Sequence, residues 1–298
     1  MSKVSSEREE SIARCCLHGD SENGFKTQLQ STQHRIDIVT KWDIPEGSKI
    51  LELGCGQGDC TAVLADFVGP DGHVTAVDPG SLDYGSPWTL GQAQAHLTKE
   101  GAPLHGRISW KQADPLKFLE EDDTKYDIGV LVLCTWYFAS SEVLANTLTA
   151  LSKRVSRICI AEWSLSSATA DTHILAALTQ AALERHNPNS SSNVRTLFSP
   201  AAIKSAAKET GWTTESETTF TPRDHVLDGK WEVGAVTYEK KDGTAGFSAD
   251  VKKFVKDEKD RSVIYALRDA MVASLERVGG SNKVKSMDVW CASLKRSE

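Results

Sequence analysis

A glycine-rich turn directly after a short apolar strand constrains this chain more than any other feature of its sequence. The run Leu51–Asp59 reads LELGCGQGD, and a second apolar stretch, Val74–Val77, is followed by Asp78. In parallel α/β sheets, such a turn and an acidic residue after the next strand form a site for a nucleoside-bearing cofactor. Glycine is needed there because a turn packed against a ligand leaves no room for Cβ atoms and often requires a positive φ.

The spacing of the glycines indicates which cofactor this turn binds. Gly54, Gly56 and Gly58 follow G-x-G-x-G, whereas the dinucleotide fingerprint G-x-G-x-x-G has its third glycine where this chain has Asp59. A carboxylate at a helix N-terminus opposes a bound phosphate, so Asp59 favours a cationic ligand without a pyrophosphate. Asp78 can accept hydrogen bonds from both hydroxyls of a ribose. A ribose and a cationic amino acid group together predict S-adenosylmethionine.

These motifs resemble those of the class I S-adenosylmethionine-dependent methyltransferases. ILELGCGQGD is similar to the first motif of that family, VTAVDPG to the second, and QSTQHRIDIVTKWDIPEGSK to the helix that leads into the first strand. The resemblance covers residues 25–165 well and the later residues in outline. It implies an α/β fold with a doubly wound, mostly parallel seven-stranded sheet, and it says almost nothing about the methyl acceptor.

The order of apolar segments supports the same fold class. Strands are predicted in alternation with helices, which is the pattern of a parallel, doubly wound sheet. The predicted strands are residues 49–53, 73–77, 107–112, 126–133 and 156–162, and the predicted helices between them are 60–67, 89–98, 115–119 and 141–152. The continuous apolar run at 126–133 is typical of a strand that is buried on both faces.

The last part of the chain departs from this alternation. The family ends its sheet with an antiparallel hairpin, and the best candidates for its strands are 213–221 and 287–295. A helical insert at about 226–285, with a long helix at 250–278, would then separate the two strands. Such an insert either packs on the domain or forms a lid over the acceptor site. We expect 25–298 to form one methyltransferase domain, preceded by a polar and partly disordered segment at 1–24.

The resemblance also implies cofactor contacts for residues of the first two motifs. The backbone at Gly54, Gly56 and Gly58 would approach the cofactor, and Asp78 would bind the ribose. Glu52 would hold the methionine end through a backbone or water contact, and Asp59 would lie near the methionine amine.

Further contacts are expected outside these motifs. Asp114, after the third strand, would accept from the adenine amine, and the backbone carbonyl of Cys134 would accept from the methionine amine. Gln30 or Gln33 in the leading helix would reach the methionine carboxylate.

Methyl transfer needs no dedicated catalytic motif, because positioning and desolvation carry much of the catalysis at an activated sulfonium. The sequence accordingly leaves the catalytic residues open. Tyr137, His173 and His225 are the candidate bases, for an acceptor that must lose a proton. An N-P-P-[YF] motif is absent, since the fourth strand leads into LCTWYF at 133–138, and no metal-ligand cluster is evident.

Aromatic residues near the predicted strand ends are candidates for an acceptor pocket, because loops at the carboxyl ends of parallel strands frame the ligand crevice. Their rings could hold a flat apolar or a cationic acceptor. These residues are Tyr84, Trp88, Trp136, Tyr137, Trp163 and Trp231.

Composition limits the partners and the compartment. The 298 residues carry a net charge of -7 and no basic run, so nucleic acid is not expected as a substrate. Seven cysteines without a CxxC pair indicate reduced thiols and a cytoplasmic protein. No stretch of 18 apolar residues indicates a membrane span. The oligomeric state stays open.

The function that fits these features is methyl transfer from S-adenosylmethionine to an oxygen, nitrogen or sulfur atom of a small molecule. Two alternatives remain. One is a protein methyltransferase with a regulatory role, for which the insert would supply an extended groove. The other is a protein that binds the cofactor and catalyses a rearrangement or cyclisation without transferring a methyl group.

Overall fold

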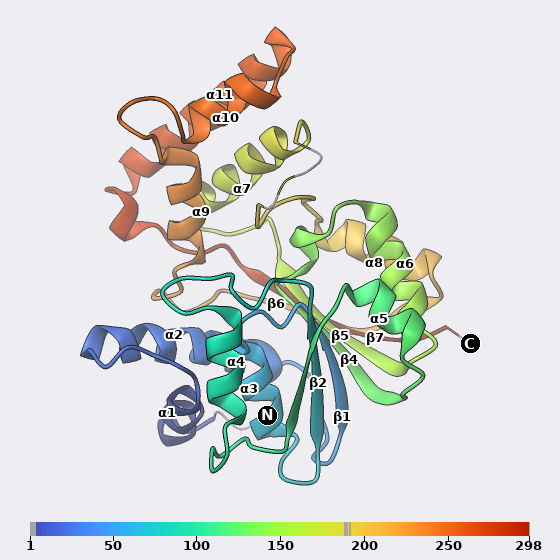
Figure 1. Cartoon of the computed structure of the whole chain (residues 1–298). Coiled ribbons are helices and arrows are strands. Elements are labelled where there is room, and N and C mark those ends of the chain that lie inside the picture. Colours follow the sequence, from blue (N-terminus) through green and yellow to red (C-terminus); the bar gives the residue numbers. More distant parts are fainter. Residues whose placement is uncertain (1–3, 188–189, 191, 298) are drawn as a thin grey trace.

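A mixed seven-stranded sheet forms the centre of the molecule, in the order β3-β2-β1-β4-β5-β7-β6 (Figure 1). The computed structural model describes residues 4–187, 190 and 192–297. The strands are β1 Lys49–Leu53, β2 His73–Asp78, β3 Ile108–Gln112, β4 Tyr126–Val132, β5 Val155–Trp163, β6 Trp212–Phe220 and β7 Val289–Arg296. The strands β1 to β5 pair in parallel, while β7 is antiparallel to both β5 and β6. The doubly wound fold and its final hairpin are therefore confirmed.

The central strands are apolar because helices cover both faces of the sheet. Ile50, Leu51, Val130, Leu131 and Ile160 are all 0% exposed. The helices α2 Glu22–Val39, α3 Asp59–Phe67 and α4 Leu90–Thr98 cover one face, and α5 Pro115–Glu121, α6 Ser141–Leu151 and α8 Pro200–Glu209 cover the other (Figure 1). This arrangement leaves the carboxyl ends of the parallel strands free to carry loops.

The N-terminal segment is helical, contrary to the expectation of partial disorder. Helix α1 spans Ser6–Cys15, and the hydroxyl of Ser5 caps it by accepting from the amide of Arg8. Most of its polar residues are exposed, while Glu9, Ile12 and Ala13 are buried, 5%, 2% and 0% exposed. A polar composition therefore concealed an amphipathic helix that packs on α2 and α3.

Four helices form a lobe at one end of the sheet, which Figure 1 shows in yellow-green and orange. They are α7 Asp171–Glu184, α9 Asp228–Thr237, α10 Phe247–Phe254 and α11 Glu258–Arg277. The lobe has a hydrophobic cluster of its own, which includes Val233, Phe247 and Met271. Three of its helices, α9 to α11, connect β6 to β7.

The long helix expected at 250–278 is two helices. The chain breaks between α10 and α11, where the carboxylate of Asp257 accepts from the amides of Lys259 and Asp260. Aspartate is a strong N-cap residue, and this cap starts a new helix at Glu258. The apolar spacing alone did not reveal the interruption.

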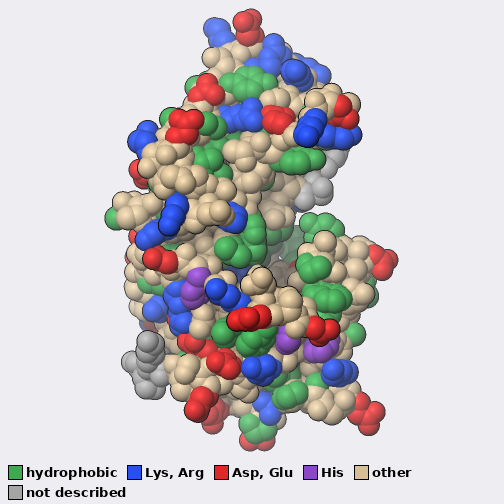
Figure 2. All heavy atoms as spheres, turned by 90° about the vertical axis from the view of Figure 1, so that its left-hand side faces the viewer, with side chains coloured by type: hydrophobic (Ala, Val, Ile, Leu, Met, Phe, Trp, Pro, Cys, Tyr) green, Lys and Arg blue, Asp and Glu red, His purple; other side chains and the backbone are tan. Residues whose placement is uncertain are grey.

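A hollow marks the boundary between the lobe and the sheet domain. Figure 2 shows hydrophobic side chains gathered midway down this face, between two regions rich in charged residues.

Short 3-10 turns, η1 at Thr135–Tyr137 and η2 at Ser281–Lys283, lie after β4 and before β7. Within the described part of the chain, no helix is both long and apolar enough to cross a bilayer.

Candidate functional site

The glycine-rich turn after β1 requires glycine for two different reasons. All three glycines have positive φ: 79° at Gly54, 53° at Gly56 and 96° at Gly58. A Cβ on Gly54 would lie 2.7 Å from the Cβ of Cys134, and one on Gly58 would lie 2.7 Å from the ring of Trp110. These two glycines therefore allow close packing within the protein, and the approach of their backbone to the cofactor stays a prediction.

Gly56 alone faces open space, because a Cβ there would meet nothing within 4 Å. Its amide donates to Oδ2 of Asp78 at 2.8 Å, and Oδ1 of Asp78 accepts from the amide of Gly80 at 2.8 Å. A carboxylate has about four acceptor sites, so Asp78 keeps capacity for two more donors. An open backbone surface beside such a carboxylate fits a ribose.

Asp59 and the side chains of α2 connect the turn to a neighbouring pocket. Asp59 accepts from Nε2 of Gln28 at 2.8 Å and from the hydroxyl of Ser31 at 3.1 Å. Gln33 instead donates to Glu9 at 2.6 Å, on the side of α2 that faces α1. Gln33 is therefore placed outside the pocket, and Gln30 lines it.

The ends of β1 and β4 meet beneath the turn. Glu52 is 1% exposed and accepts from the hydroxyl of Thr61 at 2.6 Å, and burial raises its pKa to about 7. The thiol of Cys134 donates to the carbonyl of Leu53 at 3.2 Å. The preceding Leu133 has a φ of 51°, which is rare for a non-glycine residue and typical of functional sites.

Asp114 has a structural role that the sequence reading did not assign. Its carboxylate caps α5 by accepting from the amide of Lys117 at 3.0 Å, and the residue is exposed. The adjacent Ala113 donates its amide to the carbonyl of Asp78 at 3.0 Å. This bond holds the loop after β3 beside the end of β2, where an adenine contact is expected.

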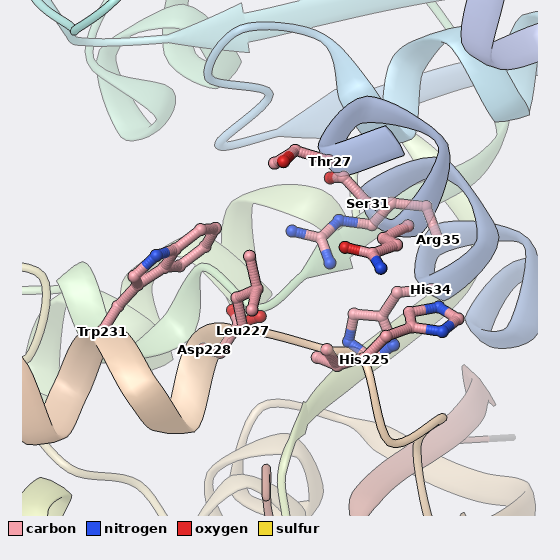
Figure 3. Close-up of a pocket in the computed structure, with 10 residues that line it drawn as sticks. Thr27, Ser31, His34, Arg35, His225, Leu227, Asp228 and Trp231 are labelled. Carbon is pink, nitrogen blue, oxygen red and sulfur yellow. The ribbon is translucent and has the colours of Figure 1, made fainter. Parts of the chain in front are cut away.

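A pocket lies between α2 and the segment that leads from β6 into α9 (Figure 3). The α2 residues recur at helical spacing of three and four, so they share one face of that helix. The lining residues are Thr27, Gln30, Ser31, His34 and Arg35 on α2, and His225, Val226, Leu227, Asp228 and Trp231 on the other wall. Figure 3 shows the Arg35 guanidinium directed into the space between these walls.

Three pocket residues, His34, Arg35 and Asp228, were not anticipated from the sequence. His34 is 2% exposed, and neither ring nitrogen has a hydrogen-bond partner among the residues that the structure describes. Burial lowers its pKa well below the ordinary value, as do the nearby cations, first of all Arg35. No local sequence signal marks these residues, because they come together in a pocket only where α2 meets the insert.

The candidate bases differ in their suitability. Burial lowers the pKa of His173 to about 3, and its Nδ1 accepts from the amide of Met287 at 3.0 Å. The other nitrogen of His173 then carries the proton, so this ring cannot act as a base. His225 lines the pocket, its Nε2 has no partner among the described residues, and burial lowers its pKa.

Tyr137 is unsuited to act as a base at neutral pH. Burial raises its pKa, as do the carboxyls of Glu232, Glu162 and Asp228. The residue is nevertheless 48% exposed. Three carboxyls therefore lie near enough to Tyr137 to act on its hydroxyl.

The six aromatic candidates separate into core and surface residues. Trp136 is 4% exposed and its Nε1 donates to the carbonyl of Phe198 at 2.9 Å, so it is a core residue and not a pocket residue. Trp163 is also buried and stacks on His34 with ring centroids 5.6 Å apart, which places it behind the pocket wall.

The remaining rings are accessible. Tyr84 is 62% exposed and Trp231 is 58% exposed, while Trp88 is half-buried and accepts from Gln57 through its carbonyl. Trp231 is the aromatic residue that lines the pocket. Among the described residues, no group of three or more His, Cys, Asp or Glu is arranged to hold a metal ion.

Comparison with known proteins agrees with this geometry. Residues 50–156 match the family model described as a methyltransferase domain. The methyltransferase phomM' of Diaporthe leptostromiformis is 28% identical, over 89% of this chain and 83% of that protein.

Solved structures give the same result. A cyclopropane-fatty-acyl-phospholipid synthase-like protein from Lactobacillus casei is 29% identical with a TM-score of 0.80, covering 98% of this chain and 100% of that one. Haemonchus contortus Phospholethanolamine N-methyltransferase 2, in complex with phosphomonomethylethanolamine and S-adenosylhomocysteine, shares the fold at 12% identity, with a TM-score of 0.51 over 89% of this chain and 53% of that one. The motifs, the fold and these relatives together establish that the chain belongs to the class I methyltransferases, enzymes that use S-adenosylmethionine.

Proposed function

We propose that this enzyme transfers the methyl group of S-adenosylmethionine to a small molecule bound between α2 and α9. The observation that carries this proposal is the pocket in Figure 3, which adjoins the glycine-rich turn through Ser31 and Asp59 and has Trp231 on its far wall. A concave site with one aromatic wall and a few polar groups is typical of small-molecule binding. One relative's structure holds a small amine phosphoester, which agrees with an acceptor of this size.

Residues of the turn and of α2 would hold the cofactor. The backbone at Gly56 would lie against it, and Asp78 would accept from the ribose hydroxyls. Arg35 is suited to the methionine carboxylate, because a guanidinium recognises carboxylates through paired hydrogen bonds. Arg35 also lies close enough to influence the pKa of Glu52, beneath the turn.

The chain contributes to the reaction mainly by positioning and by excluding water. When bound, the cofactor supplies a methyl group that is already activated for in-line displacement. Trp231 and the start of α9 form the wall opposite α2, so the Trp231 side chain would cover the acceptor and exclude water. Gly229 fixes the start of that wall. Its amide donates to the Ser286 hydroxyl at 3.0 Å, and a Cβ on Gly229 would lie 2.6 Å from the Lys285 carbonyl.

Trp231→Ala tests whether the insert shapes the acceptor site. We expect acceptor turnover to fall while the affinity for S-adenosylhomocysteine, measured by calorimetry, stays near that of the wild type. Tyr238→Ala is the matched control, because Tyr238 is equally exposed at 59% in the same insert but does not line the pocket. Loss of cofactor affinity with unchanged acceptor kinetics would refute the assignment of Trp231 to the acceptor.

Incubation with methyl-labelled S-adenosylmethionine and a cell extract tests the class of acceptor. Label in a small metabolite supports the proposal, whereas label in a polypeptide indicates a protein methyltransferase.

We also propose that the enzyme works in the cytoplasm, where its seven free cysteines would stay reduced. Fractionation of cells that express the native chain tests this location.

A further inference from the structure

Two opposite charges face the same pocket and act on each other without an ion-pair contact between their side chains. Arg35 and Asp228 both line it, and neither side chain forms an ion pair or hydrogen bond with another side chain in the described part of the protein. Arg223, which is also half-buried, is by contrast paired with Glu9 and Asp37. Half-buried charges are costly to leave unpaired, so this pair indicates a ligand that carries charges of its own.

The two charges lie on different walls of the pocket. Arg35 is on α2, near Glu52 and the glycine-rich turn. Asp228 opens α9 in the lobe, on the wall that also carries Trp231. Figure 3 shows the two side chains on opposing walls of the pocket, with the Trp231 ring beyond Asp228. The basic group therefore lies on the α2 wall and the acidic group on the α9 wall, beside Trp231.

Other carboxyl groups lie near Asp228 and Tyr137. The carboxyls of Glu232, Glu162 and Asp228 all act on the hydroxyl of Tyr137, which follows β4. The carboxylate of Glu232 is held in place by Nε2 of Gln180. Two exposed rings, Tyr137 and Trp231, accompany these carboxyls. Aromatic faces and carboxylates both attract organic cations. A neutral alcohol or a carboxylic acid gains no such attraction.

We propose that the acceptor is a basic amine and that Asp228 binds its ammonium form and takes up its proton. This inference rests on the proposed small-molecule methyl transfer and specifies which of the three acceptor atoms the site selects. The unpartnered His34, with no hydrogen bond to either ring nitrogen among the described residues, indicates that the same pocket also receives a polar group from its ligand.

The chemistry of such a step balances within the site. A protonated amine has no free electron pair, so one proton must first leave the nitrogen for the Asp228 carboxylate. The neutral amine then forms a bond to the methyl carbon as the methyl–sulfur bond breaks, and the sulfur keeps that electron pair. The methylated amine departs as a cation, and Asp228 releases its proton to water.

Binding of a simple amine tests the selection of an amine separately from the proposed methyl transfer to a small molecule. The probe is 2-phenylethylamine, titrated by calorimetry into the complex of the protein with S-adenosylhomocysteine, and the neutral comparison is 2-phenylethanol. We expect the amine to bind more tightly than the alcohol. Asp228→Asn should weaken the amine about tenfold or more, as expected for loss of a charged hydrogen bond, and leave the alcohol unchanged.

Asp224→Asn is the matched control, because Asp224 is in the same segment but its side chain is 78% exposed and pairs with Lys285. That variant should bind both probes as the wild type does. Equal amine binding by the Asp228→Asn and Asp224→Asn variants, or no preference of the wild type for the amine, would overturn the inference. Failure of the wild type to bind S-adenosylhomocysteine would instead count against the proposed cofactor site.

Identification of the methylated product gives a second, independent outcome. Labelled product from a cell extract should partition into organic solvent at high pH and into water at low pH, as a methylated amine does. A labelled ether, ester or thioether would show that Asp228 does not select an amine.

Discussion

Gly56 differs from the other two glycines of its turn in what its α-carbon faces. A Cβ at Gly54 or Gly58 would collide with protein atoms, whereas one at Gly56 would enter open space. The consequence is that the three positions respond differently to substitution. Changes at Gly54 and Gly58 disturb the fold, and only a change at Gly56 tests the binding surface directly.

Gly56→Val should therefore abolish measurable binding of S-adenosylhomocysteine while the protein stays folded. The left-handed backbone costs a side chain roughly 1–2 kcal/mol, which lowers stability without unfolding the domain. Gly101→Val is the control, since Gly101 has a φ of 79° and also faces open space, away from the site. Calorimetry and thermal unfolding of both variants provide the check, and equal loss of binding in the two would disprove the assignment.

Glu162 gives the stability of the protein a pH dependence at the residue scale. Burial raises its pKa from 4.5 to about 7, and the carboxyl accepts from the amide and hydroxyl of Thr135 and from the amide of Trp163. The folded state then binds more protons than the unfolded state between these two values. Stability from this group is present below pH 4.5 and is lost as the pH rises to about 7.

Glu162→Gln should remove this loss, which amounts to on the order of 3 kcal/mol for a shift of this size. Urea unfolding at several values between pH 5 and pH 8 measures it as the difference between wild type and variant. A difference is needed because His173, with a pKa lowered to about 3, acts in the opposite direction as the pH rises. Parallel pH profiles for the two proteins would contradict the prediction.

At the scale of elements, a single arginine joins the N-terminal helices to the wall of the pocket. Arg223 precedes α9, and its guanidinium binds Asp37 of α2 at 2.8 Å and Glu9 of α1 at 2.7 Å. The side chain of Glu9 is only 6% exposed, so this pairing offsets part of the cost of burying a carboxylate. Helix α1 thereby holds the segment that carries His225 and Asp228 against α2.

Arg223→Met should destabilise the protein by about 3 kcal/mol, because it leaves a buried carboxylate without its guanidinium. Lys285→Met breaks an ion pair on the same segment, but that pair is 44% and 78% exposed and is worth at most about 1 kcal/mol. Urea unfolding of the two variants compares these values. Equal losses of unfolding free energy in the two variants would mean that Arg223 does not hold α1 and α2 against the segment before α9.

At the scale of the whole molecule, cofactor binding couples the turn, α2 and the lobe. A ligand that binds only the folded state stabilises it by about 2.7 kcal/mol at a concentration of one hundred times its Kd. We expect S-adenosylhomocysteine to raise the unfolding temperature by several degrees and NAD to leave it unchanged. The reason is Asp59 at the start of α3, whose carboxylate opposes a pyrophosphate. Stabilisation by NAD and not by S-adenosylhomocysteine would reverse this interpretation.

Elements and cofactor class were predictable because their signals are local. The apolar runs of β1 and β4, the glycines at 54, 56 and 58, and the aspartate after β2 can each be recognised from the neighbouring residues in the chain. The five parallel strands were therefore located within one or two residues of their ends. The errors arose where a local pattern was ambiguous, as in the helix α1 and the break before Glu258.

The proposed acceptor site depends on the tertiary structure alone. Arg35 and Asp228 are far apart in the sequence and face one pocket only because α2 packs beside the segment before α9. Trp136 and Trp231 look equivalent as sequence signals, yet one is 4% exposed and the other 58%. The physical reason is that side-chain convergence depends on how helices and loops pack, whereas periodicity and turn chemistry are written along the chain itself.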